Sequence, residues 1–357
     1  MKLIVQPADG PAPLLKAIKQ AQKSIEIVIF RFDLADLEHA LEDAAERGVR
    51  VHALIAFTNR GGEKSLRKLE MRFLEKGITV ARTADDLVRY HGKMMLVDSK
   101  ELYLLTYNFT RLDTRSRSFG VATKNRDLVQ EASRLFEADT TRQAYTSRCD
   151  KLVVSPANAR KRLAAFLKGA KRELLIYDVD IADKEMLRIL EDRCLAGVTV
   201  KIIGHVGASK HLTARTFGRM RLHTRVIIRD GKQLFLGSQS LRKLELDARR
   251  EIGMIVNSPR IVSAMATVFD DDWNASVPGT AEKKHAHARA ERASKKAVKI
   301  AERKLSPAPV VKDMLKVIES EVNVDVDPSQ AAQVVKGALK KAVKKAAAKI
   351  VEEAVAK

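Results

Sequence analysis

The sequence of 357 residues has few cysteines, few aromatic residues and no long apolar run. Cys149 and Cys194 cannot build a disulfide framework, and no Cys/His cluster has the spacing of zinc ligands. No stretch approaches the roughly 20 apolar residues that a membrane-spanning helix needs. The apolar run near the N-terminus is too short for a signal peptide and stops at prolines. We therefore expect a cytoplasmic chain without a transmembrane segment, whose contact with a membrane is at most peripheral.

Acidic residues are the minority among the charged ones, with 45 Asp and Glu against 66 Lys and Arg. The resulting net charge of +21 favours a polyanionic partner, which means nucleic acid, anionic lipid or a phosphorylated substrate. Apolar residues make up 45% of the chain, which is enough for sizeable cores filled mainly by Leu, Ile and Val. Charge therefore indicates the kind of partner, while the apolar pattern indicates the fold.

The pattern of expected elements runs twice along the chain. Helix, strand, helix and strand are expected at 14–23, 24–32, 34–47 and 49–57, and again at 157–169, 173–179, 184–196 and 198–204. Residues 23–28 match 171–176 in sequence, and 45–51 match 194–200. This is an internal duplication, and its order of elements indicates βαβ units on a mainly parallel sheet. We place the first repeat at residues 1–148 and the second at 149–275.

Each repeat carries the same spaced motif. A histidine is followed by a basic residue after two positions, Asp after seven, a hydroxyl residue after fifteen and another polar residue after seventeen. In the first repeat these are His91, Lys93, Asp98, Thr106 and Asn108, and in the second they are His223, Arg225, Asp230, Ser238 and Ser240. On a strand, residues two apart face the same side, so the histidine and the basic residue can point at one ligand. The odd offset turns Asp98 and Asp230 to the other face, where we predict a structural role.

The doubled motif resembles the paired HxKxxxxD motifs, with a trailing GSxN, of the phospholipase D superfamily. The resemblance covers roughly residues 1–275, and among the members of that superfamily it is greatest to soluble bacterial phospholipase D and cardiolipin synthase-like proteins. It implies an α/β fold of two tandem repeats, each a mixed sheet flanked by helices, with one site shared between them. It also implies a phosphohistidine intermediate and no cofactor.

The residue types suit that chemistry. One imidazole attacks phosphorus, and a second protonates the leaving oxygen and later takes a proton from the incoming water or alcohol. Flanking cations and amides neutralise the phosphate oxygens, so no metal is required. By resemblance, His91 is the nucleophile and His223 the acid/base. Phosphate or substrate binding falls to Lys93, Arg225, Asn108, Thr106, Ser238 and Ser240.

The motif departs from the superfamily pattern in both repeats. Leu105 replaces Gly in the first, while Arg225 replaces Lys and Ser240 replaces Asn in the second. Eleven residues after Ser240 stands Glu251, where the superfamily often has an acid that orients the histidine, and the matching position after Asn108 is Phe119. We therefore expect the acid to serve the second repeat, which leaves an inverted nucleophile assignment open.

Three functions remain open from the sequence. The leading one is phosphodiester cleavage or phosphatidyl transfer on a phospholipid-type substrate. The second is a nuclease or nucleic-acid phosphodiesterase, and the third is a decayed site that only binds phosphate. The remaining histidines and the Arg-rich loop 111–118 are expected to be surface or packing features; these histidines are His39, His52, His205, His211, His285 and His287.

Residues 276–357 differ in composition from the repeats. This tail holds 18 Lys and Arg against 10 Asp and Glu, and residues 330–355 have helical periodicity. The composition is typical of a solvated, partly disordered helical tail. The alternative is a basic arm that binds nucleic acid or an anionic membrane surface.

Overall fold

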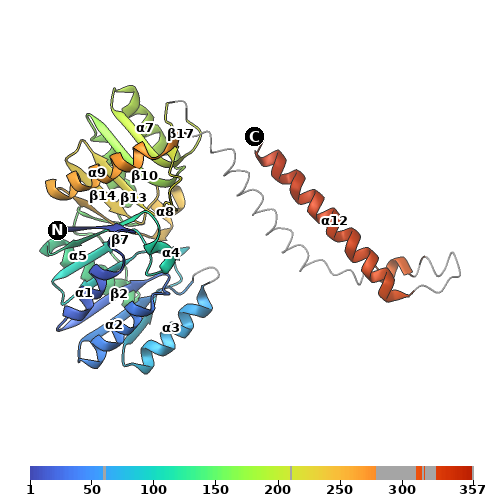
Figure 1. The fold of residues 1–357 in the computed structure, drawn as a ribbon, viewed down its shortest axis with the longest axis horizontal. Coiled ribbons are helices and arrows are strands. Elements are labelled where there is room, and N and C mark those ends of the chain that lie inside the picture. Colours follow the sequence, from blue (N-terminus) through green and yellow to red (C-terminus); the bar gives the residue numbers. More distant parts are fainter. Residues whose placement is uncertain (59–61, 210, 279–310, 316, 318–326, 356–357) are drawn as a thin grey trace. The chain divides into compact units, whose positions relative to one another are not determined.

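The computed structural model describes residues 1–58, 62–209, 211–278, 311–315, 317 and 327–355 (Figure 1). The chain divides into two compact units, Met1–Gly279 and Thr280–Lys357. Both repeats lie in the first unit. The described part of the tail contains α12 (Pro328–Val355). The expected acidic stretch at 322–327 and the Lys/Ala-rich stretch at 282–304 fall almost wholly outside the described residues.

The first repeat forms a seven-stranded sheet in the order β1-β8-β7-β6-β2-β3-β4. Its strands are β1 (Lys2–Gln6), β2 (Ser24–Ile29), β3 (Arg50–Ile55), β4 (Thr79–Arg82), β6 (Met94–Val97), β7 (Glu101–Leu105) and β8 (Ser118–Thr123). Its helices are α1 (Ala12–Gln20), α2 (Ala35–Glu46), α3 (Glu63–Glu75), α4 (Arg111–Thr114) and α5 (Arg126–Thr141). Only β2–β3 and β3–β4 pair in parallel. The expectation of a mainly parallel sheet was wrong, because the β6–β7 hairpin and β8 return antiparallel.

The second repeat follows the same plan with an eight-stranded sheet in the order β17-β12-β11-β10-β13-β14-β16-β9. Its strands are β9 (Leu152–Val154), β10 (Glu173–Ile181), β11 (Thr199–Val206), β12 (Ala214–Thr216), β13 (Arg225–Arg229), β14 (Gln233–Gly237), β16 (Ile252–Val256) and β17 (Val277–Pro278). Its helices are α6 (Ala159–Lys168), α7 (Lys184–Leu195), α8 (Lys243–Asp247) and α9 (Pro259–Asn274). The predicted fold class of two α/β repeats, each a mixed sheet flanked by helices, is confirmed.

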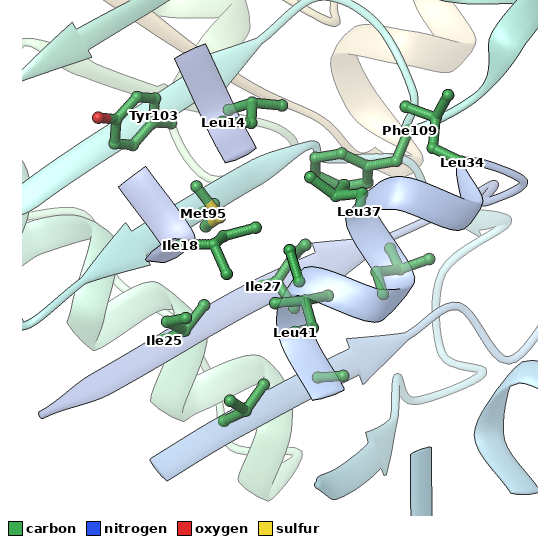
Figure 2. Packing of buried hydrophobic residues seen from close by; sticks show 14 of the residues in the cluster. Leu14, Ile18, Ile25, Ile27, Leu34, Leu37, Leu41, Met95, Tyr103 and Phe109 are labelled. Atoms are coloured by element: carbon green, nitrogen blue, oxygen red, sulfur yellow. The ribbon is translucent and has the colours of Figure 1, made fainter. Parts of the chain in front are cut away.

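The outer face of each sheet is covered by helices of its own repeat. In the first repeat, Leu14 and Ile18 of α1 and Leu37 and Leu41 of α2 pack on the sheet (Figure 2). These residues recur at a spacing of four, which places them on one face of each helix. In the second repeat, α6 and α7 form the corresponding cluster.

The inner faces of the two sheets share one apolar core. Met94 and Phe119 of the first repeat lie in the same buried cluster as Tyr177 and Ile252 of the second, together with residues of α5 and α9. The rings of Phe119 and Tyr177 lie 5.4 Å apart, so the repeats are in direct contact. This shared core fixes the position of each repeat relative to the other, and a site built from both can therefore be rigid.

Asp98 and Asp230 each follow a hairpin's first strand and adopt a left-handed backbone conformation, with φ of 53° and 56°. The Asp98 carboxylate accepts hydrogen bonds from the backbone N–H groups of Gln22, Lys23 and Ser24. Asp230 accepts the equivalent bonds in the second repeat from residues 171–173. Burial would raise the pKa of either carboxyl, but the three N–H donors outweigh it and lower the pKa. Both residues thus tie the hairpin turn to the start of a central strand.

Candidate active site

The two motif histidines are held by backbone contacts to the opposite repeat. Strand β5 (Arg89–Tyr90) pairs in parallel with β15 (Arg249–Arg250), and the His91 N–H donates to the Arg250 carbonyl at 2.7 Å. The His223 N–H donates to the Arg117 carbonyl at 3.0 Å. Both imidazoles are nearly buried, with exposed fractions of 7% and 9%. The repeats therefore position each other's histidines.

His91 is oriented by a carboxylate from the second repeat. Its Nδ1 lies 2.8 Å from Glu251 Oε2, and Glu251 is fully buried. The Phe30 ring packs edge-on against the imidazole, with a centroid distance of 4.5 Å. With Nδ1 engaged by the carboxylate, Nε2 is the nitrogen that can act on a substrate.

His223 is oriented by a carboxylate from the first repeat. Its Nδ1 lies 2.9 Å from Asp113 Oδ1, and Arg221 Nη1 lies 2.5 Å from the same oxygen. The other oxygen, Asp113 Oδ2, accepts from the Asn108 backbone N–H at 2.8 Å and from Asn108 Nδ2 at 2.6 Å. Helix α4 presents Asp113, and Thr110 caps this short helix.

The expectation that Glu251 serves the second repeat was wrong, because this carboxylate crosses to His91. The expected loop 111–118 contains α4 and with it Asp113, which the sequence analysis missed. Both copies carry an acid five residues after the last motif position, Asp113 after Asn108 and Glu245 after Ser240. That repeated acid was the available signal.

The matching of Phe119 with Glu251 was also off by one residue. Thr106 makes backbone hydrogen bonds to Phe119, and Ser238 makes the same bonds to Ile252, so these two residues are equivalent. Ser118 is therefore the equivalent of Glu251. The offset arises because α4 is one residue shorter than α8. The first repeat has no acid at this position, and Asp113 lies beside His223 instead.

The hydroxyls of Thr106 and Ser238 are directed at backbone groups of a neighbouring strand. Thr106 Oγ1 donates to the Phe119 carbonyl and accepts from the Phe119 N–H, at 3.1 and 3.0 Å. Ser238 Oγ makes the same pair of contacts with Ile252, at 3.4 and 3.1 Å. Both side chains are fully buried, so the predicted substrate-binding role is replaced by a bridge between neighbouring strands.

The two basic motif residues are buried beside the histidines. Lys93 Nζ donates to the His91 carbonyl at 2.6 Å and lies 5.5 Å from the centre of the Phe30 ring. Arg225 Nε donates to Ser240 Oγ at 2.8 Å. Arg225 Nη1 is buried without a hydrogen-bond partner among the described residues, so it is a donor available to a phosphate oxygen. Ser240 thus positions Arg225, where the sequence predicted that it binds substrate.

Asn108 was expected to bind phosphate, but its side-chain amide donates to Asp113. Its Nδ2 is used by Asp113, and its buried Oδ1 has no hydrogen-bond partner among the described residues. A phosphate oxygen accepts hydrogen bonds, so this amide would have to turn over to bind one. In the present conformation Asn108 holds the acid that orients His223.

Burial and neighbouring charges separate the two histidines electrostatically. Burial, followed by the charges of Lys93 and Arg225, lowers the pKa of His91 well below its ordinary value. Burial also lowers the pKa of His223 to about 4, but here the Asp113 carboxylate opposes the shift. Burial would raise the pKa of Asp113, yet His223 and the Asn108 N–H hold it below its ordinary value. His91 is therefore a neutral imidazole, whereas His223 is the ring whose cation is stabilised by an ionised partner.

Burial lowers the pKa of Lys93 to about 7, with the charge of Arg225 adding to the shift and Glu251 opposing it. Burial raises the pKa of Glu251.

In the described part of the chain, no cluster of three or more His, Cys, Asp or Glu side chains has the arrangement of a metal site. Nor do the described residues include a helix that is long and apolar enough to cross a membrane.

Comparisons with known proteins agree with this fold. Residues 14–140 match the family model described as "Cardiolipin synthase, PLD-like domain". The match covers most of the first repeat and agrees with the resemblance of the doubled motif to the phospholipase D superfamily.

Several curated relatives are polyphosphate kinases. That of Prosthecochloris aestuarii is 24% identical over 330 residues, which covers 78% of this chain and 45% of the relative. That of Mycolicibacterium gilvum is 26% identical and covers 65% of this chain and 35% of the relative. The chain thus spans less than half the length of these relatives.

Solved structures share the fold. Polyphosphate kinase from Porphyromonas gingivalis superposes with a TM-score of 0.64 at 20% identity, covering 75% of this chain and 46% of that one. Phosphatidylserine synthase from Haemophilus influenzae superposes with a TM-score of 0.61 at 10% identity, covering 78% of this chain and 86% of that one.

Proposed function

We propose that this chain is a phosphotransferase or phosphodiesterase that works through a phosphohistidine on His91. The observation that carries the proposal is the crossed pair of dyads, in which the Nδ1 of each histidine lies 2.8 or 2.9 Å from a carboxylate oxygen of the opposite repeat. Such a pair supplies a nucleophile and an acid/base catalyst in one site. Lys93 and Arg225 provide the positive charge that a transferring phosphoryl group requires.

His91 fits the role of nucleophile because it is the ring least able to hold a proton. Lys93 and Arg225 both disfavour its cation, and a neutral Nε2 has the lone pair that attacks phosphorus. In this first step the Nε2–P bond forms, the bond from phosphorus to the leaving oxygen breaks, and His223 gives its Nε2 proton to that oxygen. His223 has a lowered pKa of about 4 in the free chain, and the negative charge of a bound phosphate, together with the Asp113 carboxylate, favours the cation from which this proton comes.

The second step returns the enzyme to its starting state. Water or an alcohol attacks the phosphorus, its proton passes to His223 Nε2, and the bond between phosphorus and His91 breaks. Water as acceptor gives hydrolysis, and an alcohol or a phosphate gives transfer. The same residues serve both outcomes, so the identity of the acceptor decides the reaction.

Three donor classes fit the buried cations of the site. A phosphodiester, such as a phospholipid, is the donor that the sequence predicts, and the description of the matching family model supports it. A polyphosphate is the second candidate, because the relatives named polyphosphate kinase align over both repeats. A nucleic-acid phosphodiester is a third donor that suits the net charge of +21.

The basic tail adds a possible partner to this proposal. We infer that residues 276–357 bind a polyanion, since they carry 18 basic and 10 acidic residues. Their removal should weaken binding to single-stranded DNA or anionic vesicles and reduce its dependence on salt. Binding that is unchanged by the truncation would rule this out.

Trapping the covalent intermediate tests the proposal. The chain is mixed with radiolabelled polyphosphate, phosphatidylglycerol or single-stranded DNA, quenched in alkali, and assayed for acid-labile label. We expect label on the wild type and on His223→Ala with one of these donors, and none on His91→Ala. Label on His91→Ala but not on His223→Ala would invert the assignment. Absence of label with every donor would favour a decayed, phosphate-binding site.

A further inference from the structure

Each motif histidine receives its backbone contact from an arginine of the opposite repeat. The His91 N–H donates to the Arg250 carbonyl, and the His223 N–H donates to the Arg117 carbonyl. The two arginines are equivalent, because each stands two residues before the strand residue to which the motif hydroxyl is bonded. Whatever fixes these arginines therefore fixes the backbone of both histidines.

The Arg250 side chain is held by Asp139 of α5, in the repeat that carries His91. Arg250 Nε donates to Asp139 Oδ1 at 3.1 Å, and Nη2 lies 3.1 Å from the same oxygen. Arg250 Nη1 donates to the Ser155 carbonyl at 3.2 Å, and the guanidinium carbon lies 5.6 Å from the centre of the Tyr90 ring. Burial raises the pKa of Asp139 to about 6 against the effect of Arg250, so the carboxylate is mostly ionised at neutral pH.

The Arg117 side chain is held in the same way by Asp272 of α9, in the repeat that carries His223. Arg117 Nη2 donates to Asp272 Oδ1 at 2.9 Å, and Nε lies 2.7 Å from Oδ2. Arg117 Nη1 donates to the Gln6 carbonyl at 2.9 Å, and the guanidinium carbon lies 5.8 Å from the centre of the Phe217 ring. Asp272 is buried, so this ion pair, like the first, lies inside the junction of the repeats.

The two pairs are copies of one crossed arrangement. Each aspartate lies 14 residues after the N-cap of its helix, from Asn125 to Asp139 and from Ser258 to Asp272. In both repeats the arginine stands 22 residues before the aspartate, from 117 to 139 and from 250 to 272. Each arginine nevertheless binds the aspartate of the other repeat. The duplication has therefore kept a second spaced pattern, which accompanies the histidine motif.

We propose that these two Arg–Asp pairs are positioning residues for the reaction, one pair for each histidine. A guanidinium is planar and presents its N–H donors in a fixed fork, so binding a carboxylate and a carbonyl together sets the orientation of the arginine. The carbonyl of that arginine then sets the position of the histidine backbone and with it the imidazole. Arg250 and Asp139 act on His91, the nucleophile. Arg117 and Asp272 act on the acid/base histidine. The roles of the two histidines rest on the proposed function, whereas the positioning does not.

Amide hydrogen exchange on the full chain tests the positioning without any reaction. In Asp139→Asn the protection of the His91 N–H should fall about 10-fold relative to that of the His223 N–H, the effect of one weakened charged hydrogen bond. Asp272→Asn should shift the same ratio about 10-fold in the opposite direction. The ratio removes any loss of global stability, which lowers both protections alike. Glu70→Gln, a carboxylate paired with two arginines inside the first repeat, is the matched control and should leave the ratio unchanged. An unchanged ratio in either aspartate variant, or a shift in the same direction in both, overturns the proposal.

A paired apolar variant removes both charges without leaving one of them buried alone. Arg250→Met combined with Asp139→Leu should keep the chain folded, because a buried ion pair can be replaced by apolar residues at little cost. The variant lacks the directional donors, so the low relative protection of the His91 N–H should persist. Recovery of the wild-type ratio would make the pair a filler of the junction and overturn its positioning role.

Two donors separate the steps that the proposed function assigns to the two histidines. Phosphatidylglycerol has an alcohol leaving group that needs the proton of His223, whereas bis(4-nitrophenyl) phosphate releases a 4-nitrophenolate that needs none. Asp272→Asn should slow labelling by phosphatidylglycerol about 10-fold and leave the release of 4-nitrophenolate nearly unchanged. Asp139→Asn should slow both about 10-fold, because the nucleophile serves both donors. Equal slowing with both donors in both variants would contradict a separate role for each pair. Absence of reaction in the wild type would count against a phosphodiester donor, and the exchange ratio would still decide the positioning.

Discussion

Glu251 and His91 are 160 residues apart and belong to different repeats, yet Oε2 of the one lies 2.8 Å from Nδ1 of the other. The contact is possible because β5 and β15 pair across the repeats and place the two residues side by side. The corresponding contact in the other direction joins Asp113 of the first repeat to His223 of the second. Asp113 and Glu251 stand at different positions relative to the motif of their own repeat. The site is therefore asymmetric, and each half depends on an acid that the other half supplies.

Replacing Glu251 with Gln tests whether this contact matters to chemistry. The amide leaves the imidazole nearly in place but no longer selects the tautomer with a proton on Nδ1. We expect phosphoenzyme formation to slow by about 100-fold or more, as at other carboxylate–histidine pairs. Asp113→Asn should slow leaving-group departure in the same assay. Glu70→Gln is a control, since this partly buried carboxylate of α3 binds Arg67 and Arg82. An equal loss in the control would attribute the effect to folding.

Lys93 gives the reaction a specific dependence on pH. Its lowered pKa of about 7 means that the side chain is a cation below pH 7 and loses charge above it. The second-order rate of phosphoenzyme formation should therefore fall as the pH rises through about 7. A bound phosphate favours the cation and raises the pKa, so the rate at saturating donor should fall only at higher pH. Lys93→Met should be slow throughout and lack this alkaline fall. Persistence of the fall in Lys93→Met would assign it to another group.

Arg225 and Ser240 replace the Lys and Asn of the superfamily pattern, and they form one unit because Ser240 Oγ accepts from Arg225 Nε. Arg225→Lys keeps the charge but loses both the Ser240 bond and the buried Nη1 donor. We expect the concentration of donor at half-maximal labelling to rise about 10-fold. Adding Ser240→Asn should recover part of this loss, because it restores the superfamily pair, and a double-mutant cycle measures the coupling. Independent effects of the two changes would show that they do not act as a unit.

The sequence predicted the duplication and the fold because strand and helix periodicity, like the motif spacing, are local features of the chain. It also located His91, Lys93, His223 and Arg225, which the structure brings together at the junction of the repeats. It did not predict where the acids act, because Glu251 and Asp113 reach histidines of the opposite repeat. A one-residue difference between α4 and α8 also hid the equivalence of Ser118 and Glu251.

The hydroxyls were misassigned for a related reason. Thr106 and Ser238 stand at motif positions that the resemblance associates with substrate, but their bonding partners are backbone groups on a neighbouring strand. Spacing along the chain indicates which face of a strand a residue occupies, and it does not indicate what lies opposite. The 2.7 Å contact between His205 Nδ1 and Asp180 Oδ1 was not predicted for the same reason, since the two residues are 25 positions apart on adjacent strands.

Changes at Asp98 and Asp230 test whether these two motif residues serve stability alone and take no part in the reaction. Each carboxylate accepts three backbone N–H groups at the start of a central strand, so Asp98→Ala should lower the free energy of unfolding by about 1–3 kcal/mol. Alanine adds strain at this left-handed backbone position, whereas Asn tolerates it and keeps one acceptor oxygen. Asp98→Asn should therefore cost less than Asp98→Ala, and Asp230 should follow the same order. Denaturant unfolding measures the stability, and phosphoenzyme formation at a temperature where all variants are folded should be unchanged. A slowed reaction in a fully folded Asp98→Ala would place this carboxylate in the chemistry after all.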